Sequence, residues 1–276
     1  MDNHWNNIMI WQGGTASLDK PTLVIEGIDT GNSTGPEEYY GLGSSLFEAM
    51  RGEGGDIAIL DFMDGGRDLV ENAAVVETAI DFLGRYRTNK RRGLDVAGLS
   101  MGGVLARYAL ARMEGDGVRH AVSRFVSLDA PQRGAVVDYN FQLYLRDNAC
   151  ELGQSLPSSV CIPPTMLPRD LWSRAGQQLL VSNAFDTGYP SRHSHFFGAL
   201  RNLNGGTGYP QLTTNVGVSF GTAAPNPNTG ARWASFVWPQ WTNGNFYITG
   251  QIAQGGSFLP SMPEQPGNLS RSFGAA

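Results

Sequence analysis

Residues 94–114, LDVAGLSMGGVLARYALARME, decide the fold of this chain. Residues 94–99 are apolar enough for a buried strand, and residues 101–114 have the apolar spacing of a helix. Ser100 stands between them in a G-x-S-x-G pattern. A serine on a sharp turn from strand to helix is exposed beside the free amide groups of the helix N-terminus, which suits a nucleophile. The alternative is a glycine-rich turn whose serine has no chemical role.

Strands and helices alternate through the first half of the chain. Apolar runs predict the strands, and apolar residues at helical spacing predict the helices. The predicted strands are residues 22–28, 56–62, 94–99 and 122–129, and the predicted helices are residues 37–51, 68–87 and 101–114. Because parallel strands are joined through crossover helices, this order predicts an α/β fold with a mostly parallel sheet and helices on both faces.

The pattern changes after residue 131. Residues 131–205 contain helices and loops without a clear strand, and they predict a cap or lid inserted into a single domain of residues 1–276. The best helices of the insertion are residues 168–182 and 192–203, and a further strand is predicted at 212–220. Residues 222–276 are rich in Gly, Asn, Pro and Trp, which predicts irregular structure or β-hairpins.

The composition excludes some functions and bears on the compartment. The net charge of −5 argues against nucleic acid as a partner. No apolar run approaches the ~20 residues of a membrane span, and no signal peptide is visible. Cys150 and Cys161 are either free thiols or a disulfide that would require an oxidising compartment. The low charged fraction of 16% and the 36 glycines favour a secreted protein over a cytoplasmic one. No cofactor and no metal site are predicted.

Three segments resemble one family. They are GLSMGGVLARYAL at 98–110, LVIEGID at 23–29 and VSLDAPQRGA at 126–135. Together they resemble the α/β-hydrolase superfamily, and within it the bacterial lipases and esterases. The resemblance implies a serine carboxylic ester hydrolase that works through an acyl-enzyme, with Ser100 as the nucleophile.

The resemblance also implies an oxyanion hole made of two backbone amides. One amide belongs to the residue after the nucleophile, here Met101. The other comes from the loop after an earlier strand, where Ile28 is the natural candidate and Asp29 is the next. Lipases often carry His-Gly at that point, whereas this chain has Glu26 before Gly27. The change leaves a backbone donor intact but alters the local charge.

The acid and the base are harder to place. In this superfamily the order along the chain is nucleophile, acid, histidine. Asp129 is the first candidate acid because it ends the strand that follows the nucleophile strand, and Asp186 is the alternative. His195 is the first candidate base, with His193 as the alternative. At most one of the two rings faces the nucleophile, because helix positions two apart point about 200° apart.

The C-terminal part of the chain lacks the groups that this fold normally places there. No histidine follows His195, and residues 202–270 contain only Arg232 and Glu264 as charged residues. Two expectations follow. Either the base comes from the insertion, or the chain is a C-terminally truncated hydrolase that lacks its histidine alone or both its histidine and its acid.

The expected substrate is a hydrophobic ester, either a small molecule or a lipid or polyester. The insertion would place apolar residues over the serine, and tail aromatics would add surface or simply pack in hairpins. The apolar cap residues are Phe141, Leu143, Tyr144, Leu145, Ile162, Met166, Leu167, Leu171 and Trp172, and the tail aromatics are Trp233, Trp238, Trp241, Phe246 and Tyr247. The competing functions are a binding domain without a working base and an acyltransferase. The oligomeric state is not indicated.

Overall fold

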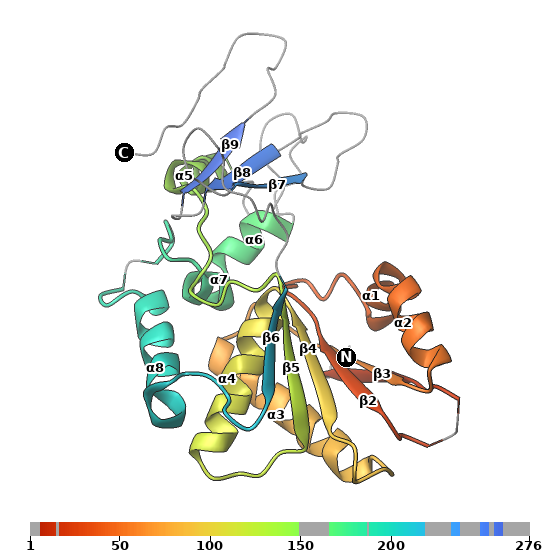
Figure 1. Cartoon of the computed structure of the whole chain (residues 1–276). Coiled ribbons are helices and arrows are strands. Elements are labelled where there is room, and N and C mark those ends of the chain that lie inside the picture. Colours follow the sequence, from red (N-terminus) through yellow and green to blue (C-terminus); the bar gives the residue numbers. More distant parts are fainter. Residues whose placement is uncertain are drawn as a thin grey trace, which may run out of the picture.

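A six-stranded, mostly parallel sheet forms the centre of the molecule (Figure 1). The computed structural model describes residues 6–14, 17–148, 166–186, 188–218, 233–237, 249–253 and 257–261. The strands are β1 (Asn7–Trp11), β2 (Pro21–Ile25), β3 (Asp56–Asp61), β4 (Leu94–Leu99), β5 (Val122–Leu128) and β6 (Thr214–Val218). Their order is β1-β3-β2-β4-β5-β6, and only the β1–β3 pair is antiparallel. This topology confirms the predicted fold class.

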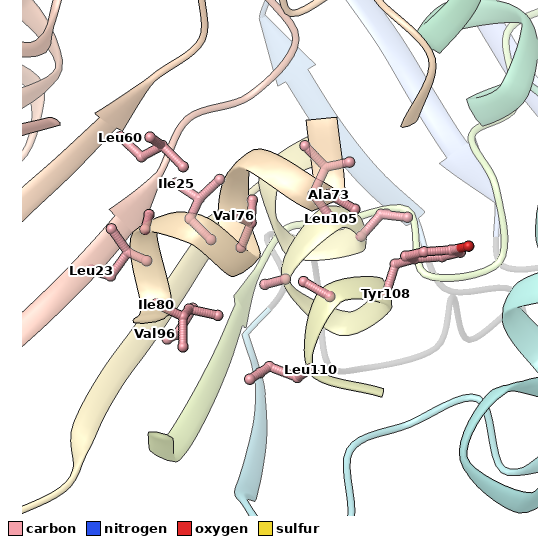
Figure 2. Close-up of a cluster of buried hydrophobic side chains, with 14 of the residues drawn as sticks. Leu23, Ile25, Leu60, Ala73, Val76, Ile80, Val96, Leu105, Tyr108 and Leu110 are labelled. Carbon is pink, nitrogen blue, oxygen red and sulfur yellow. The ribbon is translucent and has the colours of Figure 1, made fainter. Parts of the chain in front are cut away.

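Two long helices cover one face of the sheet and build the main core. Helix α3 (Leu69–Tyr86) begins at Asp68, whose carboxylate accepts the Val70 amide, and α4 (Met101–Gly115) packs on β4 and β5. The apolar residues at helical spacing on α3 are all fully buried: Leu69, Ala73, Val76, Ile80 and Leu83. Figure 2 shows residues of β2, β3, α3 and α4 converging in this cluster.

Two helices that were predicted to be continuous are each divided in two. Residues 37–51 form α1 (Pro36–Leu42) and α2 (Ser44–Gly52), which pack against β3 and are separated at Gly43. Residues 168–182 form α6 (Met166–Trp172) and α7 (Arg174–Leu179). Here Ser173 starts the second helix, because its hydroxyl accepts the Gly176 amide at 2.9 Å.

Other boundaries also differ from the sequence-based prediction. The strand predicted at 22–28 ends at Ile25, so residues 26–28 form a loop, and neither β1 nor α5 (Tyr139–Asn148) was predicted. Helix α8 (Arg192–Gly206) lies where it was predicted, with non-helical backbone from Leu203 to Gly205. In the tail, β7 (Trp233–Val237), β8 (Thr249–Ala253) and β9 (Ser257–Ser261) form an antiparallel sheet.

The predicted insertion meets the sheet in two ways. Helix α8 packs along α4, while α6 and α7 lie beyond the carboxyl ends of the strands (Figure 1). Two contacts join the insertion to the loops there: Thr30 donates to the Asp170 carboxylate at 2.9 Å, and the Ala175 amide donates to Gly66. Three predicted cap residues, Phe141, Leu145 and Leu171, pack with Leu180 in a small core of their own.

Close contact between β2 and α4 gives a test of the fold. A Cβ atom on Gly102 would lie 2.3 Å from the Glu26 carbonyl oxygen and 2.5 Å from that of Ile25. Gly102→Ala should therefore lower the free energy of unfolding by about 1–3 kcal/mol, because backbone has to move. Gly198→Ala on α8 is the control, since its Cβ would meet nothing within 4 Å. It should stabilise the protein by about 0.5–1 kcal/mol through helix propensity. Equal effects in urea unfolding would contradict the prediction.

Candidate active site

Ser100 occupies a strained turn between β4 and α4. Its backbone has φ 51° and ψ −120°, which a residue other than glycine seldom adopts, and it stands at the N-cap of α4. The Ser100 amide donates to Leu128 of the neighbouring strand β5 at 2.9 Å, which ties the turn to the sheet. Within the described residues its hydroxyl makes no hydrogen bond. The hydroxyl is thus held on a fixed backbone and is available for reaction.

Glycines make this turn possible by close approach rather than by flexibility. A Cβ atom on Gly98 would lie 2.4 Å from the Gly102 carbonyl carbon, and one on Gly103 would lie 2.5 Å from the Ala130 Cβ atom. Real Cβ atoms do not approach other atoms this closely. The packing of β4, α4 and the loop after β5 therefore requires glycine at positions 98 and 103, because only a hydrogen atom fits in place of Cβ. This packing accounts for the G-x-S-x-G-G pattern that identified the turn in the sequence.

Two backbone amides, those of Met101 and Ile28, were predicted to form an oxyanion hole with Ser100. Met101 is the first residue of α4, and Ile28 lies in the loop after β2, which touches the serine. A Cβ atom on Gly27 in that loop would lie 3.4 Å from the Ser100 Cβ atom. Within the described residues neither the Met101 nor the Ile28 amide has a backbone acceptor. Free amides at a helix N-terminus stabilise developing negative charge.

Asp29 fixes the shape of the loop that carries Ile28. It is 6% exposed, and its carboxylate accepts the Gly31 amide at 3.1 Å and the Ser33 and Thr34 amides at 2.8 Å each. The Asp29 carbonyl oxygen also accepts the Gly65 amide at 3.0 Å from the loop after β3. Sequence analysis assigned Asp29 no such role. An Asp before a Gly-Asn-Ser-Thr run is the signal that could have found it.

Carboxyl groups gather on the side of this loop that faces β3 and α6. The pKa of Glu26 is raised to about 9, mainly by burial and in smaller part by Asp61 and Asp29, while the hydrogen bond from the Phe62 amide lowers it. Burial is also the main cause that raises the pKa of Asp61 to about 6 and the pKa of Asp170 to about 6. The described residues contain no group of three or more His, Cys, Asp or Glu arranged to hold a metal ion.

Asp129, the first candidate acid, lies at the same sheet edge as Ser100. Leu99 at the end of β4 pairs with Leu128 at the end of β5. Ser100 and Asp129, the next residue on each strand, therefore lie at the same edge of the sheet. Asp129 is exposed, has φ 45°, and donates its amide to Val218 of β6 at 2.7 Å. The structure thus brings the candidate nucleophile and the candidate acid to one edge.

The turn after Asp129 is anchored to α4 by buried polar groups. Gln132 donates to the Gly103 carbonyl oxygen at 3.0 Å and to the Ser127 hydroxyl at 2.9 Å. Arg107 is 4% exposed, and its guanidinium donates to the Gln132 carbonyl oxygen at 2.7 Å and to that of Gly208 at 2.5 Å. The Arg107 guanidinium also lies 3.7 Å from the centre of the Tyr209 ring. These contacts attach both the turn after Asp129 and the segment before β6 to helix α4.

The candidate histidines do not contact Ser100. His193 Nδ1 lies 3.1 Å from the Gln178 carbonyl oxygen, and burial lowers the pKa of this ring. His195 is exposed on α8. This helix stacks Phe196 on Tyr108, at 5.4 Å between ring centres. Tyr108 lies about 12 Å along α4 from Ser100 at 1.5 Å per residue. Phe196 in the middle of α8 therefore packs about two turns along α4 from the nucleophile, while His193 near the start of α8 lies against Gly134 in the turn after Asp129.

Asp186, the alternative acid, has a structural role. Its carboxylate accepts the Arg192 amide at 2.5 Å, at the start of α8, and the Gly188 amide at 3.0 Å within its own turn. Cys150, Cys161, Ile162 and the side chains of Met166, Leu167 and the tail aromatics lie outside the described residues. None of the helices in the described part of the chain combines the length and the apolar character needed to cross a bilayer.

Solved structures that resemble this chain are esterases and thioesterases of the α/β-hydrolase fold. Est1E from Butyrivibrio proteoclasticus is 17% identical over 58% of this chain and 57% of that protein, with a TM-score of 0.35. A lipase-esterase related protein from Clostridium acetobutylicum is 16% identical over 51% and 54%, with a TM-score of 0.36. An esterase from Exiguobacterium antarcticum is 14% identical over 51% and 50%, with a TM-score of 0.34.

The chain spans about half the length of these solved structures. Neither a family model nor a curated protein matches the sequence.

Arg107 gives a test of how the acid-bearing turn is held. Arg107→Met should lower the free energy of unfolding by about 2 kcal/mol or more, because two buried carbonyl oxygens lose their donor. Arg85→Met is the control, since Arg85 pairs with Asp81 on the surface of α3 and its side chain is 74% exposed. That change should cost at most about 0.5 kcal/mol. Chemical denaturation measures both, and an Arg107 variant as stable as the Arg85 variant would contradict this account.

Proposed function

We propose that this protein is a serine carboxylic ester hydrolase. The observation that carries the proposal is the Ser100 turn: a strained serine at a helix N-terminus, flanked by the Met101 amide and by the loop that bears Ile28. Such a turn costs folding free energy of about 1–3 kcal/mol and has no evident structural use, so it favours a chemical role.

The proposed reaction proceeds through an acyl-enzyme. Ser100 Oγ attacks the ester carbonyl carbon while a base takes its proton, and the oxygen becomes an oxyanion held by the Met101 and Ile28 amides. The C–O bond to the alcohol then breaks, and the alcohol leaves with the proton. A water molecule next attacks the acyl-enzyme, which releases the carboxylic acid and restores the serine. No cofactor is needed in this scheme.

Asp129 and His195 complete the proposed set of catalytic residues. Asp129 suits the acid because it follows the strand beside the nucleophile strand, at the same edge as Ser100. His195 is the proposed base from the insertion, with His193 as the alternative. Neither ring has a hydrogen bond to Ser100 in this structure, so the proposal requires one of them to come closer to the serine.

The proposed substrate is an ester with an apolar acyl group. Helices α6 and α7 lie over the carboxyl ends of the strands and join the loops there through Thr30 and Gly66. A cover of this kind excludes water from the acyl-enzyme and favours apolar groups over charged ones. The carboxyl groups behind the Ile28 loop oppose anionic substrates, which also favours neutral esters.

Labelling by a fluorophosphonate probe tests the nucleophile. We expect the probe to modify Ser100, because a strained serine beside two free amides stabilises the tetrahedral phosphonyl adduct. Ser100→Ala should abolish labelling and lower the turnover of p-nitrophenyl esters at least about 10³-fold. Ser123→Ala is the matched control, an exposed serine at the start of β5 that should change neither result. Labelling that persists in the Ser100 variant would refute the proposal.

A histidine scan tests the base. The chain has four histidines, at positions 4, 120, 193 and 195, and each is changed to Asn. His195→Asn should lower kcat strongly and leave the unfolding midpoint unchanged, because the ring is exposed. His120→Asn should lower stability but not kcat, since His120 is buried against Glu114 at 3.1 Å, near the far end of α4. Full activity in all four variants would show that the base is not a histidine of this chain.

A further inference from the structure

Glu26 is buried directly beside the loop that we propose as part of the oxyanion hole. It follows the last residue of β2 and is 1% exposed. On one side, its backbone carbonyl oxygen faces Gly102 in the first turn of α4. On the other side, it precedes Gly27, which lies against Ser100. Any displacement of Glu26 therefore moves the loop that carries the Ile28 amide.

The Glu26 side chain replaces a backbone hydrogen bond where β2 and β3 separate. The last residues paired between these strands are Ile25 and Leu60. Beyond that pair the strands diverge, and Glu26 Oε1 accepts the Phe62 amide at 2.6 Å. The carboxyl group thus holds the end of β2 against the end of β3, at the point where the loop begins. Its second oxygen, Oε2, is buried and has no hydrogen-bond partner among the described residues.

The groups that face Glu26 are acidic or neutral. Asp61 at the end of β3 and Asp29 in the loop both raise the pKa of Glu26, and burial raises it most, to about 9. Tyr39 of α1 faces the same group, and its own pKa is raised by burial and by Glu26. Glu37 acts on Asp61, and the first turn of α4 contributes no titratable side chain. No cation is among the groups that shift the pKa of Glu26.

We propose that Glu26 is a positioning residue for the Ile28 loop that works as an uncharged carboxylic acid, so that its ionisation at alkaline pH switches off the Ser100 site. The inference rests on the proposed roles of Ser100 and Ile28. A neutral carboxyl group accepts the Phe62 amide without burying a charge. An ionised one adds a third negative charge, next to those of Asp61 and Asp29, and it opposes the charge that develops on the oxyanion.

The alkaline limit of Ser100 labelling is the pH above which the labelling rate falls, and we expect Glu26→Gln to raise it and Asp61→Asn to lower it. In the unmodified protein the labelling rate should fall about tenfold between pH 8 and pH 10, as expected for a group with a pKa of about 9. Glu26→Gln keeps an acceptor for Phe62 and cannot ionise, so the rate should stay level over this range. Asp61→Asn removes a neighbouring charge, so the pKa of Glu26 falls and the loss of labelling begins at lower pH. Glu26→Leu lacks the acceptor and should label slowly at every pH.

Thermal unfolding against pH provides a readout that does not need activity. The unfolded chain loses the Glu26 proton near pH 4.5, whereas the folded protein keeps it up to about pH 9. Stability is therefore lost as pH rises through this window. The unfolding midpoint of Glu26→Gln should rise relative to the unmodified protein from pH 7 to pH 9. The Asp61→Asn difference should be nearly constant from about pH 7, because the pKa of Asp61 is about 6, and it should grow only once the pH passes the lowered pKa of Glu26 in that variant.

The outcomes separate this inference from the proposed function. An alkaline limit that is unchanged in Glu26→Gln would overturn the inference while leaving Ser100 as the nucleophile. If the unmodified protein shows no Ser100 labelling at any pH, the proposed function and the positioning role fail together. The unfolding midpoints then still decide whether Glu26 is a neutral acid: a Glu26→Gln difference that does not grow with pH would refute it.

Discussion

The close approach of α4 to the end of β2 is the constraint on which the site depends. Gly102 lies against the carbonyl oxygens of Ile25 and Glu26, at distances that admit no side chain. This contact brings the loop after β2 next to the first turn of α4, and Gly27 of that loop lies against Ser100. The serine itself stands in the turn with φ 51°. The strain is balanced by burial of α3 and α4 on the sheet.

Helix α4 organises the candidate site from both of its ends. Its N-terminus supplies Met101 and the serine turn. Near its C-terminus, Glu114 accepts the amides of Gln211 at 2.5 Å and of Leu212 at 3.0 Å, just before β6 begins. These two hydrogen bonds fix the position of the start of β6 relative to α4. At the other end of β6, the Val218 carbonyl oxygen accepts the Asp129 amide. The nucleophile and the candidate acid are thus placed by one helix, which a disturbance far from Ser100 could displace.

The features that could be predicted from the sequence are those that depend on residues close to one another along the chain. The serine turn, α3, β4 and the parallel sheet were predicted because their apolar periods and glycine spacing are local. Strand β1 was missed, since NIMIW forms a strand only by pairing with β3. The divisions at Gly43 and Ser173 depend on single caps within apolar runs. The histidines show the limit most clearly, because the place of α8 depends on contacts with α4 and α7 that no spacing reveals.

The charge beside the Ile28 loop explains why the chain tolerates Glu where lipases often carry His. Three acidic side chains, Glu26, Asp29 and Asp61, lie near the loop whose Ile28 amide we propose as an oxyanion donor. The Asp29 carboxylate accepts hydrogen bonds from the amides of Gly31, Ser33 and Thr34. Burial keeps the proton on Glu26. A charged carboxylate at Glu26 would oppose the oxyanion through a poorly solvated interior, where such effects exceed those in water. The position therefore accepts an acid only where the fold keeps it neutral, and this is a property of the buried site that the residue type alone does not reveal.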